Sequence, residues 1–245
     1  MTAGDLRRAV VTGATSGIGA ATVRAFASEG LDVLAVARRG DVLAELAAET
    51  GAEVLAADVR SADAHAAVAA FAPDVLVNNA GVGHGISGLE TVGPETIATA
   101  FEVNVTAAAT LVAAVLPGMR ARRRGHVVTL GSISGLHTNV SAVYGATKAA
   151  LHRFSQNLRY ELRGSGLRVT EICPGRVSTG FYGAAEGDPQ RIEAMGRSGI
   201  RELDPEDIAA AILYAISAPA HVNVATIEIL PVEQAVGGVD ATPRA

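Results

Sequence analysis

Short apolar runs alternate with longer segments of helical periodicity along nearly the whole chain. We predict that the apolar runs are strands, and they occupy residues 9–11, 33–37, 54–57, 75–77, 127–130, 169–172 and 227–230. We predict helices between them, over residues 18–28, 42–49, 62–71, 95–119, 143–162 and 205–217. Regular alternation of strand and helix is typical of parallel βαβ units whose helices cover both faces of one sheet. The pattern therefore predicts an α/β fold with a doubly wound, seven-stranded parallel sheet.

The chain shows no linker, repeat or low-complexity segment that would separate two domains. We therefore predict one domain over residues 1–236 and a loose C-terminal tail over residues 237–245, which contains glycine and proline. The predicted helix over 95–119 carries alanines on nearly every face. Small residues on all sides indicate close packing, either against another subunit or within the monomer.

Composition and charge exclude several classes of protein. Hydrophobic residues make up 49% of the 245 residues and charged residues 18%, which excludes global disorder. The net charge of −5 gives no reason to expect a nucleic-acid partner, and the basic run over 120–124 is typical of a solvated helix end. The single cysteine, Cys173, excludes an intramolecular disulfide. The six histidines lack metal-ligand spacing, so we expect no metal site.

No segment is predicted to direct the chain to a membrane. Residues 1–8 lack the hydrophobic region of a signal peptide. The longest apolar stretch, around residues 105–116, is too short and too rich in threonine and alanine to span a bilayer. We therefore expect a soluble cytoplasmic protein without a membrane partner.

A glycine-rich loop follows the first predicted strand and opens the first predicted helix. Its sequence, Thr-Gly-Ala-Thr-Ser-Gly-Ile-Gly over 12–19, lets the chain turn sharply and lets a pyrophosphate approach the free N–H groups of the helix. A plain tight turn is the alternative, and a P-loop is excluded because no Gly-Lys-Ser/Thr ends the run. The residues expected to bind a dinucleotide here are Gly13, Thr15, Ser16, Gly17, Ile18 and Gly19.

From this loop onward the chain resembles the short-chain dehydrogenase/reductase family, over roughly residues 7 to 231. The further motifs that carry the resemblance come in the family's order: Asp58-Val59, Asn78-Asn79-Ala80-Gly81, Asn104, Ser132, Tyr144-x-x-x-Lys148 and Pro174-Gly175-Arg176-Val177-Ser178-Thr179. Several spaced motifs in one order are far more specific than any one alone. The resemblance implies a Rossmann-type fold and an oxidoreductase.

The end of the second predicted strand indicates which dinucleotide is used. A carboxylate there would bind the ribose hydroxyls of NAD, but Ala37 stands at this end, followed by Arg38 and Arg39. A guanidinium can bind a 2′-phosphate with two hydrogen bonds. We therefore predict NADP(H), with Arg38 as the main contact and Ser16 or Arg39 assisting. The alternative is that both arginines only begin a solvated helix.

The resemblance assigns further cofactor contacts. Asp58 and Val59 would hold the adenine through a carboxylate and a backbone amide. Thr179 would hydrogen-bond the nicotinamide carboxamide. The stretch over 78–81 would line the cofactor and support the sheet, and an ordinary strand-end turn is the alternative. The remaining residues implied to line the cofactor are Asn78, Ala80, Gly81, Pro174, Gly175 and Val177.

Tyr144 and Lys148 are four residues apart on a predicted helix and therefore share one face. A free tyrosine has a pKa of about 10 and is a poor base at neutral pH. A positive charge about 4 Å away contributes about 4 kcal/mol, which lowers that pKa by about 3 units at most. We expect Tyr144 to exchange a proton with the substrate oxygen while hydride moves to or from the nicotinamide. By resemblance, Lys148 would also hold the nicotinamide ribose.

Two more polar residues complete the predicted catalytic group. Ser132 ends the fifth predicted strand and can donate a hydrogen bond to the substrate oxygen. By resemblance, Asn104 holds a water that relays protons beyond Lys148; the alternative is a helix-interior amide that is satisfied locally. A serine-hydrolase elbow is excluded because Ile133 stands where Gly-x-Ser-x-Gly needs its serine.

The substrate pocket is expected to lie between the serine loop and a flap over about residues 176–200. His137 lies between Ser132 and Tyr144, on a loop that should edge this pocket. Aromatic residues in the flap are as compatible with packing as with ligand contact. The candidate substrate contacts are Ser134, His137, Phe181 and Tyr182.

The resulting hypothesis is an NADP(H)-dependent enzyme that interconverts a small ketone or aldehyde and its alcohol. The stretch over 218–231 resembles the branch of bacterial serine/3-hydroxy-acid dehydrogenases and clavulanic-acid-type aldehyde reductases, but the substrate does not follow from it. A non-catalytic NADP(H)-binding sensor is the main alternative, and an epimerase or dehydratase usually needs a longer chain. The resemblance also implies a homo-oligomer, a tetramer before a dimer, joined through the helices over 95–119 and 143–162.

Overall fold

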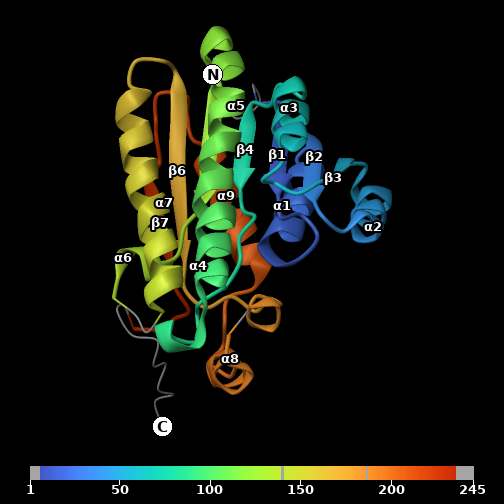
Figure 1. The fold of residues 1–245 in the computed structure, drawn as a ribbon. Helices are drawn as coiled ribbons and strands as arrows, with labels where there is room; N and C mark the ends of the chain where they lie inside the picture. The colour runs from blue at the N-terminus through green and yellow to red at the C-terminus, as the bar shows by residue number, and fades with distance from the viewer. Residues whose placement is uncertain (1–5, 139–140, 186, 236–245) are drawn as a thin grey trace.

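A seven-stranded parallel sheet forms the centre of the molecule, in the order β3-β2-β1-β4-β5-β6-β7 (Figure 1). The computed structural model describes residues 6–138, 141–185 and 187–235. The strands are β1 (Arg8–Thr12), β2 (Asp32–Ala37), β3 (Glu53–Ala56), β4 (Val75–Asn78), β5 (Gly125–Leu130), β6 (Leu167–Pro174) and β7 (Thr226–Ile229). The order reverses between β1 and β4, as in doubly wound folds, so the predicted fold class is confirmed.

Helices cover both faces of this sheet. Their bounds are α1 (Gly17–Ser28), α2 (Gly40–Thr50), α3 (Ala62–Ala70), α4 (Pro94–Phe101), α5 (Ala107–Arg122), α6 (Ile133–Leu136), α7 (Ala142–Glu161), α8 (Pro189–Gly196) and α9 (Pro205–Ser217). Two 3₁₀ turns, η2 (Leu89–Thr91) and η4 (Tyr182–Ala184), and one π-helical turn, η3 (Glu102–Thr106), complete the described part. The short α6 was not predicted from the sequence, whereas α8 lies in the helix-like stretch up to Arg197 that was expected within the flap.

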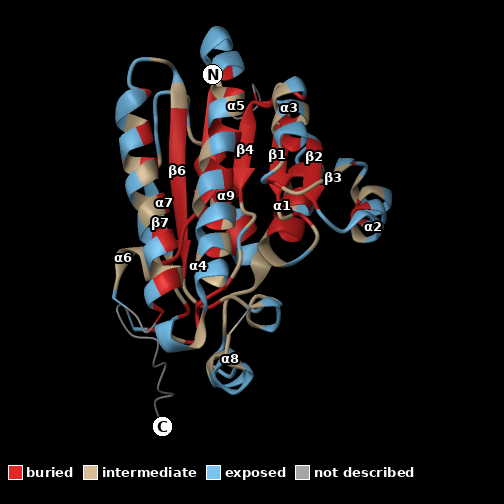
Figure 2. Ribbon diagram, viewed as in Figure 1, coloured by how far each residue is buried: buried red, intermediate tan, exposed pale blue. Residues whose placement is uncertain are grey.

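Alternation along the strands divides the core into two layers. In β1, the fully buried Ala9 and Val11 face the layer that contains α1, α2 and α9, whereas Val10 faces the layer that contains α3, α5 and α7. Both faces of the strand are therefore apolar, which is why it reads as a continuous hydrophobic run. Figure 2 shows the sheet buried throughout its centre and the helices exposed on their outer sides.

The predicted helix over 95–119 is a composite of α4, the π-helical turn η3 and α5. Within η3, the N–H of Ala107 bonds to the carbonyl of Glu102, five residues earlier. The stretch Pro94–Arg122 has 29 residues and contains an 18-residue window with a mean hydropathy of 1.6, so it is long and apolar enough by composition to cross a membrane. It is longer than the stretch considered from the sequence. Its Leu111, Val115 and Met119 pack in the core layer shared with α3 and α7, as in the core helix of a globular domain.

The single-domain prediction over 1–236 and the tail over 237–245 stay predictions. Residues 236–245 lie outside the described residues, as do residues 1–5. All seven strands belong to one sheet, and the predicted flap corresponds to η4 and α8, between β6 and α9.

Candidate active site

A cleft of about 750 Å³ opens at the carboxyl ends of the strands. Loops that follow parallel strands meet at this edge of a doubly wound sheet, so motifs far apart in the sequence come together there. The sequence-predicted residues that line the cleft are Gly13, Thr15, Ser16, Gly17, Ile18, Arg38, Arg39, Asp58, Val59, Ala80, Gly81, Ser132, Ser134, Tyr144, Lys148, Pro174, Gly175, Val177, Thr179, Phe181 and Tyr182. Four others do not line it: Gly19, Asn78, Asn104 and His137.

The glycine loop is a close-packed turn between β1 and α1. Gly13 has φ of +67°, and a Cβ there would come within 2.8 Å of the Asn79 amide nitrogen. A Cβ on Gly19 would lie 2.3 Å from the carbonyl oxygen of Gly13, which explains why this glycine supports the loop from behind instead of lining the cleft. Asn79 Nδ2 donates to the Thr12 carbonyl at 2.8 Å and ties the loop to β4. The motif over 78–81 was expected to support the sheet, and this hydrogen bond shows how Asn79 does so.

Arg38 and Arg39 follow β2 and are both exposed at the edge of the cleft. Arg39 Nη2 donates to the Thr15 carbonyl at 3.1 Å and to its hydroxyl at 3.0 Å, so this arginine braces the glycine loop. Within the described part of the chain, no hydrogen bond engages the Arg38 guanidinium. Arg38 is therefore the arginine available to a 2′-phosphate, and Arg39 is the one that assists.

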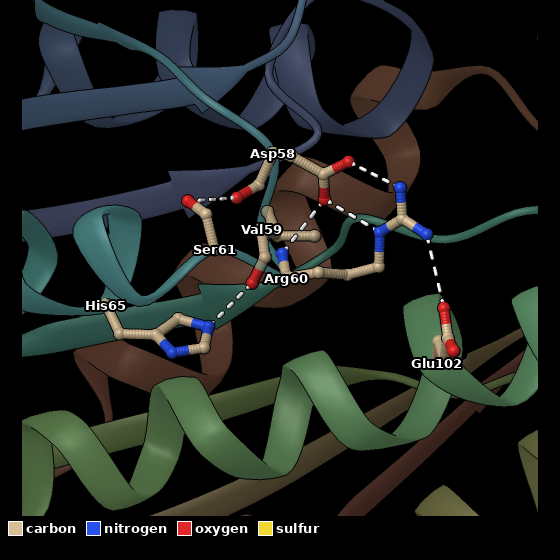
Figure 3. A network of polar contacts seen from close by, with 6 residues as sticks. All are labelled: Asp58, Val59, Arg60, Ser61, His65 and Glu102. Carbon is tan, nitrogen blue, oxygen red and sulfur yellow. Dashed lines mark hydrogen bonds and ion pairs between the residues drawn. The ribbon is translucent and has the colours of Figure 1, made fainter.

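A third arginine, Arg60, lies at the same end of the cleft and was missed by the sequence analysis. Its Nη2 and Nε donate to the two carboxylate oxygens of Asp58 at 2.7 and 3.0 Å, and its Nη1 donates to Glu102 at 3.2 Å (Figure 3). The Arg60 guanidinium lowers the pKa of Asp58 to about 2. Asp58 was predicted to bind the adenine through its carboxylate, but in this structure that carboxylate is already held by Arg60.

Ser132, Tyr144 and Lys148 meet at the other end of the cleft. Ser132 follows β5 and caps α6, where its hydroxyl accepts from the N–H of Ser134 at 3.1 Å. Its side chain also acts to lower the pKa of Tyr144, which places the two hydroxyl groups near one another. Lys148, one turn further along α7, donates from Nζ to the Leu130 carbonyl at 2.7 Å and lies 5.8 Å from the Tyr144 ring centroid. The three predicted catalytic side chains therefore occupy one corner of the cleft.

The electrostatics of this corner differ from the expectation. Burial raises the pKa of Tyr144 above its ordinary value, although the hydrogen bond from Ser132 opposes the rise. Burial lowers the pKa of Lys148 to about 8. Burial thus disfavours the charged forms of both side chains and opposes the stabilisation of the phenolate by the lysine charge. No sequence motif reveals this burial.

Asn104 lies in the π-helical turn η3 and is almost fully buried. Its Oδ1 accepts from the N–H of Val82 at 2.8 Å, and its Nδ2 donates to the Val82 carbonyl and to the Thr147 hydroxyl, both at 3.0 Å. These partners are 22 and 43 residues away in sequence, so the amide is satisfied by long-range contacts and not locally, as the alternative expected. The water-holding role of Asn104 stays a prediction. Asn78 also has a supporting role, because its Nδ2 donates to the Ala108 carbonyl at 3.1 Å.

Aromatic side chains of the flap reach the catalytic corner, but His137 does not. The rings of Phe181 and Tyr144 have centroids 5.3 Å apart. His137 Nε2 instead pairs with Glu228 at 2.8 Å, outside the lining of the cleft. The expectation that His137 edges the pocket therefore does not fit the structure, because the short helix α6 carries the loop toward β7.

The flap is anchored by Arg176, whose role sequence reasoning also missed. Arg176 is buried, and its Nε donates to Glu202 at 3.0 Å. Its guanidinium lies 5.1 Å from the centroid of the Tyr182 ring. A buried arginine with a carboxylate and an aromatic partner can fix the base of the flap.

Comparisons with known proteins agree with the geometry. The family model described as short chain dehydrogenase matches residues 7–189. The chain is 38% identical over 242 residues to the NADP-dependent 3-hydroxy acid dehydrogenase of Escherichia coli (strain K12), covering 94% of this chain and 97% of the relative. It is 36% identical over 238 residues to the serine 3-dehydrogenase of Agrobacterium fabrum, covering 94% and 95%.

Solved structures show the same likeness. The closed form of serine dehydrogenase complexed with NADP⁺ matches with a TM-score of 0.88 and 36% identity. The match covers 97% of this chain and 100% of the other. A metagenomic short-chain oxidoreductase in complex with NADP matches with a TM-score of 0.77 and 30% identity, over 93% and 98%. With its sheet order, its glycine loop and its Ser132–Tyr144–Lys148 corner, the chain belongs to the short-chain dehydrogenase/reductase family.

Proposed function

We propose that this protein is an NADP(H)-dependent oxidoreductase that interconverts a small ketone or aldehyde and its alcohol, with Tyr144 as the general acid/base. One observation carries the proposal: a single cleft joins an anion-binding glycine loop and Arg38 at one end to Ser132, Tyr144 and Lys148 at the other. The relatives that are named NADP-dependent and the solved structures that hold NADP confirm the cofactor prediction.

The residues present fit this cofactor. The glycine loop presents backbone to the cleft where any side chain would collide, and the exposed Arg38 offers a guanidinium for the 2′-phosphate. Bound NADPH supplies the hydride that reduces the carbonyl carbon. The chain's own side chains then orient the carbonyl through the Ser132 hydroxyl and deliver the proton from Tyr144 to the carbonyl oxygen.

The pKa directions fit Tyr144 as the proton donor in carbonyl reduction at neutral pH. Because burial raises the pKa of Tyr144, its phenol stays protonated and is ready to donate. Lys148, with a pKa of about 8, carries a positive charge below that pH and stabilises the phenolate that forms when the proton leaves.

The substrate end of the cleft guides the choice of substrates to test. Besides Lys148, this end contains Arg176, which is already paired with Glu202, while Phe181 and Met195 contribute apolar wall. The relatives are named for hydroxy acids and serine, which carry a carboxylate. A panel should therefore pair each neutral ketone or aldehyde with its carboxylated counterpart.

Replacing Tyr144 by Phe tests the proposal, since only one hydroxyl is removed. We expect NADPH binding, followed by cofactor fluorescence, to stay within about twofold of the unmodified enzyme. Turnover of every active carbonyl compound should fall by about 100-fold or more, the size typical of general acid–base catalysis. A variant that keeps more than about a tenth of the activity would exclude Tyr144 as proton donor. Tight NADPH binding by the unmodified protein without turnover of any compound would instead favour the sensor.

A further inference from the structure

A buried carboxylate lies behind the catalytic corner. Glu171 is on β6, and its side chain is only 1% exposed. It occupies the face of the strand that packs against α7, two residues from Val169, which belongs to the core layer on that side. An acidic side chain in such a position is costly unless it is paired, so its partners indicate what it does.

One oxygen of Glu171 is fixed and the other is directed toward the active-site strand. His152 donates from Nδ1 to Oε2 at 2.6 Å, and its other ring nitrogen lies 2.9 Å from the Gln156 amide. Oε1 has no hydrogen-bond partner among the described residues. It lies against Gly131, where a Cβ would come within 2.4 Å of it.

This second oxygen lies next to the end of the strand that binds the catalytic lysine. The Nζ of Lys148 donates to the carbonyl of Leu130, the residue that precedes Gly131. Lys148 and His152 are one turn apart on α7, so both face β6 and Glu171. The neighbouring Cys173 and, after it, Glu171 act to raise the pKa of Lys148 and so oppose the larger effect of its burial. The titratable groups around Glu171 are Lys148, His152 and Arg159 from α7 and Cys173 from β6.

We propose that Glu171 is a positioning residue for Lys148: its buried carboxylate, held by His152, faces the lysine from β6 and keeps the ammonium group protonated. Glu171 touches neither substrate nor cofactor and acts only through Lys148. A negative charge beside a buried lysine favours the charged form, which stabilises the Tyr144 phenolate. The inference rests on the proposed function, because the charge of Lys148 matters only if Tyr144 and Lys148 carry the reaction.

The test is the pH profile of kcat/KM for carbonyl reduction in Glu171→Gln, which keeps the size of the side chain and removes its charge. On the alkaline side of this profile, kcat/KM should decrease as Lys148 loses its proton. We expect this alkaline limb to lie about one pH unit lower in the variant. Activity near pH 8 should fall by up to about tenfold, while activity near pH 6 stays within about twofold. His152→Gln is the matched control, because it keeps the carboxylate and offers it an N–H donor, so its alkaline limb should stay in place.

Each other outcome has a definite meaning. An unmoved limb in Glu171→Gln, or an equal loss at every pH in both variants, would overturn the proposal and assign the pair a structural role. If the glutamine variant does not fold, Glu171→Asp replaces it, because the shorter side chain moves the carboxylate away by one methylene. The alkaline limb of kcat/KM should then shift in the same direction by less. An unshifted limb in this variant would overturn the proposal. Lys148→Met reports separately on the proposed function, which fails if that variant remains fully active.

Discussion

Arg38 and Arg39 are neighbours in sequence but have different roles. Arg39 braces the glycine loop through Thr15, whereas Arg38 makes no hydrogen bond within the described residues. We therefore propose that discrimination between the two dinucleotides depends on Arg38 and that the shape of the loop depends on Arg39. The sequence predicted the pair but could not divide these tasks between its members, because the division depends on the approach of the loop after β1.

Arg38→Asp should reverse the cofactor preference. The new carboxylate repels a 2′-phosphate and can accept hydrogen bonds from ribose hydroxyls. We expect kcat/KM with NADPH to fall by about 10- to 100-fold, the value of one charged hydrogen-bonded contact, while kcat/KM with NADH rises. Arg39→Ala is the control and should affect both cofactors by a similar factor. A preference of the unmodified enzyme for NADH would contradict the role proposed for Arg38.

His126 gives the fold a specific sensitivity to acid. It is fully buried in β5, and its Nε2 lies 2.8 Å from the Thr170 hydroxyl. Burial, assisted by the charge of Arg168, lowers its pKa to about 3 from an unfolded value of 6.5. Below pH 6.5 the unfolded chain therefore binds a proton that the folded chain does not, and stability falls as the pH falls toward 3.

Urea unfolding at several pH values tests this effect. Between pH 6.5 and 5 the contribution of His126 should lower the free energy of unfolding by about 2 kcal/mol, at about 1.4 kcal/mol per pH unit. Other groups also titrate in this range, so the measurement is a comparison with His126→Asn, which cannot gain the proton. The variant should lose less stability than the unmodified protein over the same interval. Equal losses would show that His126 is not the group responsible.

At the scale of elements, the predicted strands lie within three residues of the observed ones. The strands can be recognised in the sequence as continuous apolar runs, because both faces of each central strand are buried, as β1 shows. The π-helical turn η3 left no such signal, because it is stabilised by contacts of Asn104 with Val82 and Thr147, 22 and 43 residues away in sequence. For the same reason Arg60 and Glu171 were not predicted: their roles depend on partners that only the fold brings close.

Asn104 should contribute to stability as well as to the active site. Asn104→Ala removes hydrogen bonds to Val82 and Thr147 and leaves partly buried groups without partners, so the free energy of unfolding should fall by about 2–4 kcal/mol. Glu102→Gln in the same turn changes an exposed carboxylate whose contact is Arg60, and should cost no more than about 0.5 kcal/mol. Similar losses in both variants would contradict this role of Asn104.

At the scale of the molecule, we propose a homo-oligomer joined through α4–α5 and α7. Phe101 on α4 is 37% exposed and Tyr160 on α7 is 69% exposed, which leaves apolar surface on both helices. Ala108 is buried and Phe154 packs against the core, so replacing either of these would disturb the monomer.

Light scattering measures the assembly directly. We expect a mass of about four times the 24.9 kDa of one chain, or about twice for a dimer, at micromolar concentration. Phe101→Asp and Tyr160→Asp should reduce this mass without unfolding the monomer. A fully active protein with the mass of one chain would exclude the assembly.

The central claim is that a hydride passes from NADPH to a carbonyl carbon while Tyr144 supplies the proton. NADPH that carries deuterium at the transferred position, supplied with an active carbonyl compound, tests this most directly by mass spectrometry of the alcohol. The account predicts one deuterium per molecule of alcohol with the unmodified enzyme, formed about 100-fold or more slowly with Tyr144→Phe. Alcohol without deuterium, or equal rates for the two proteins, would contradict it.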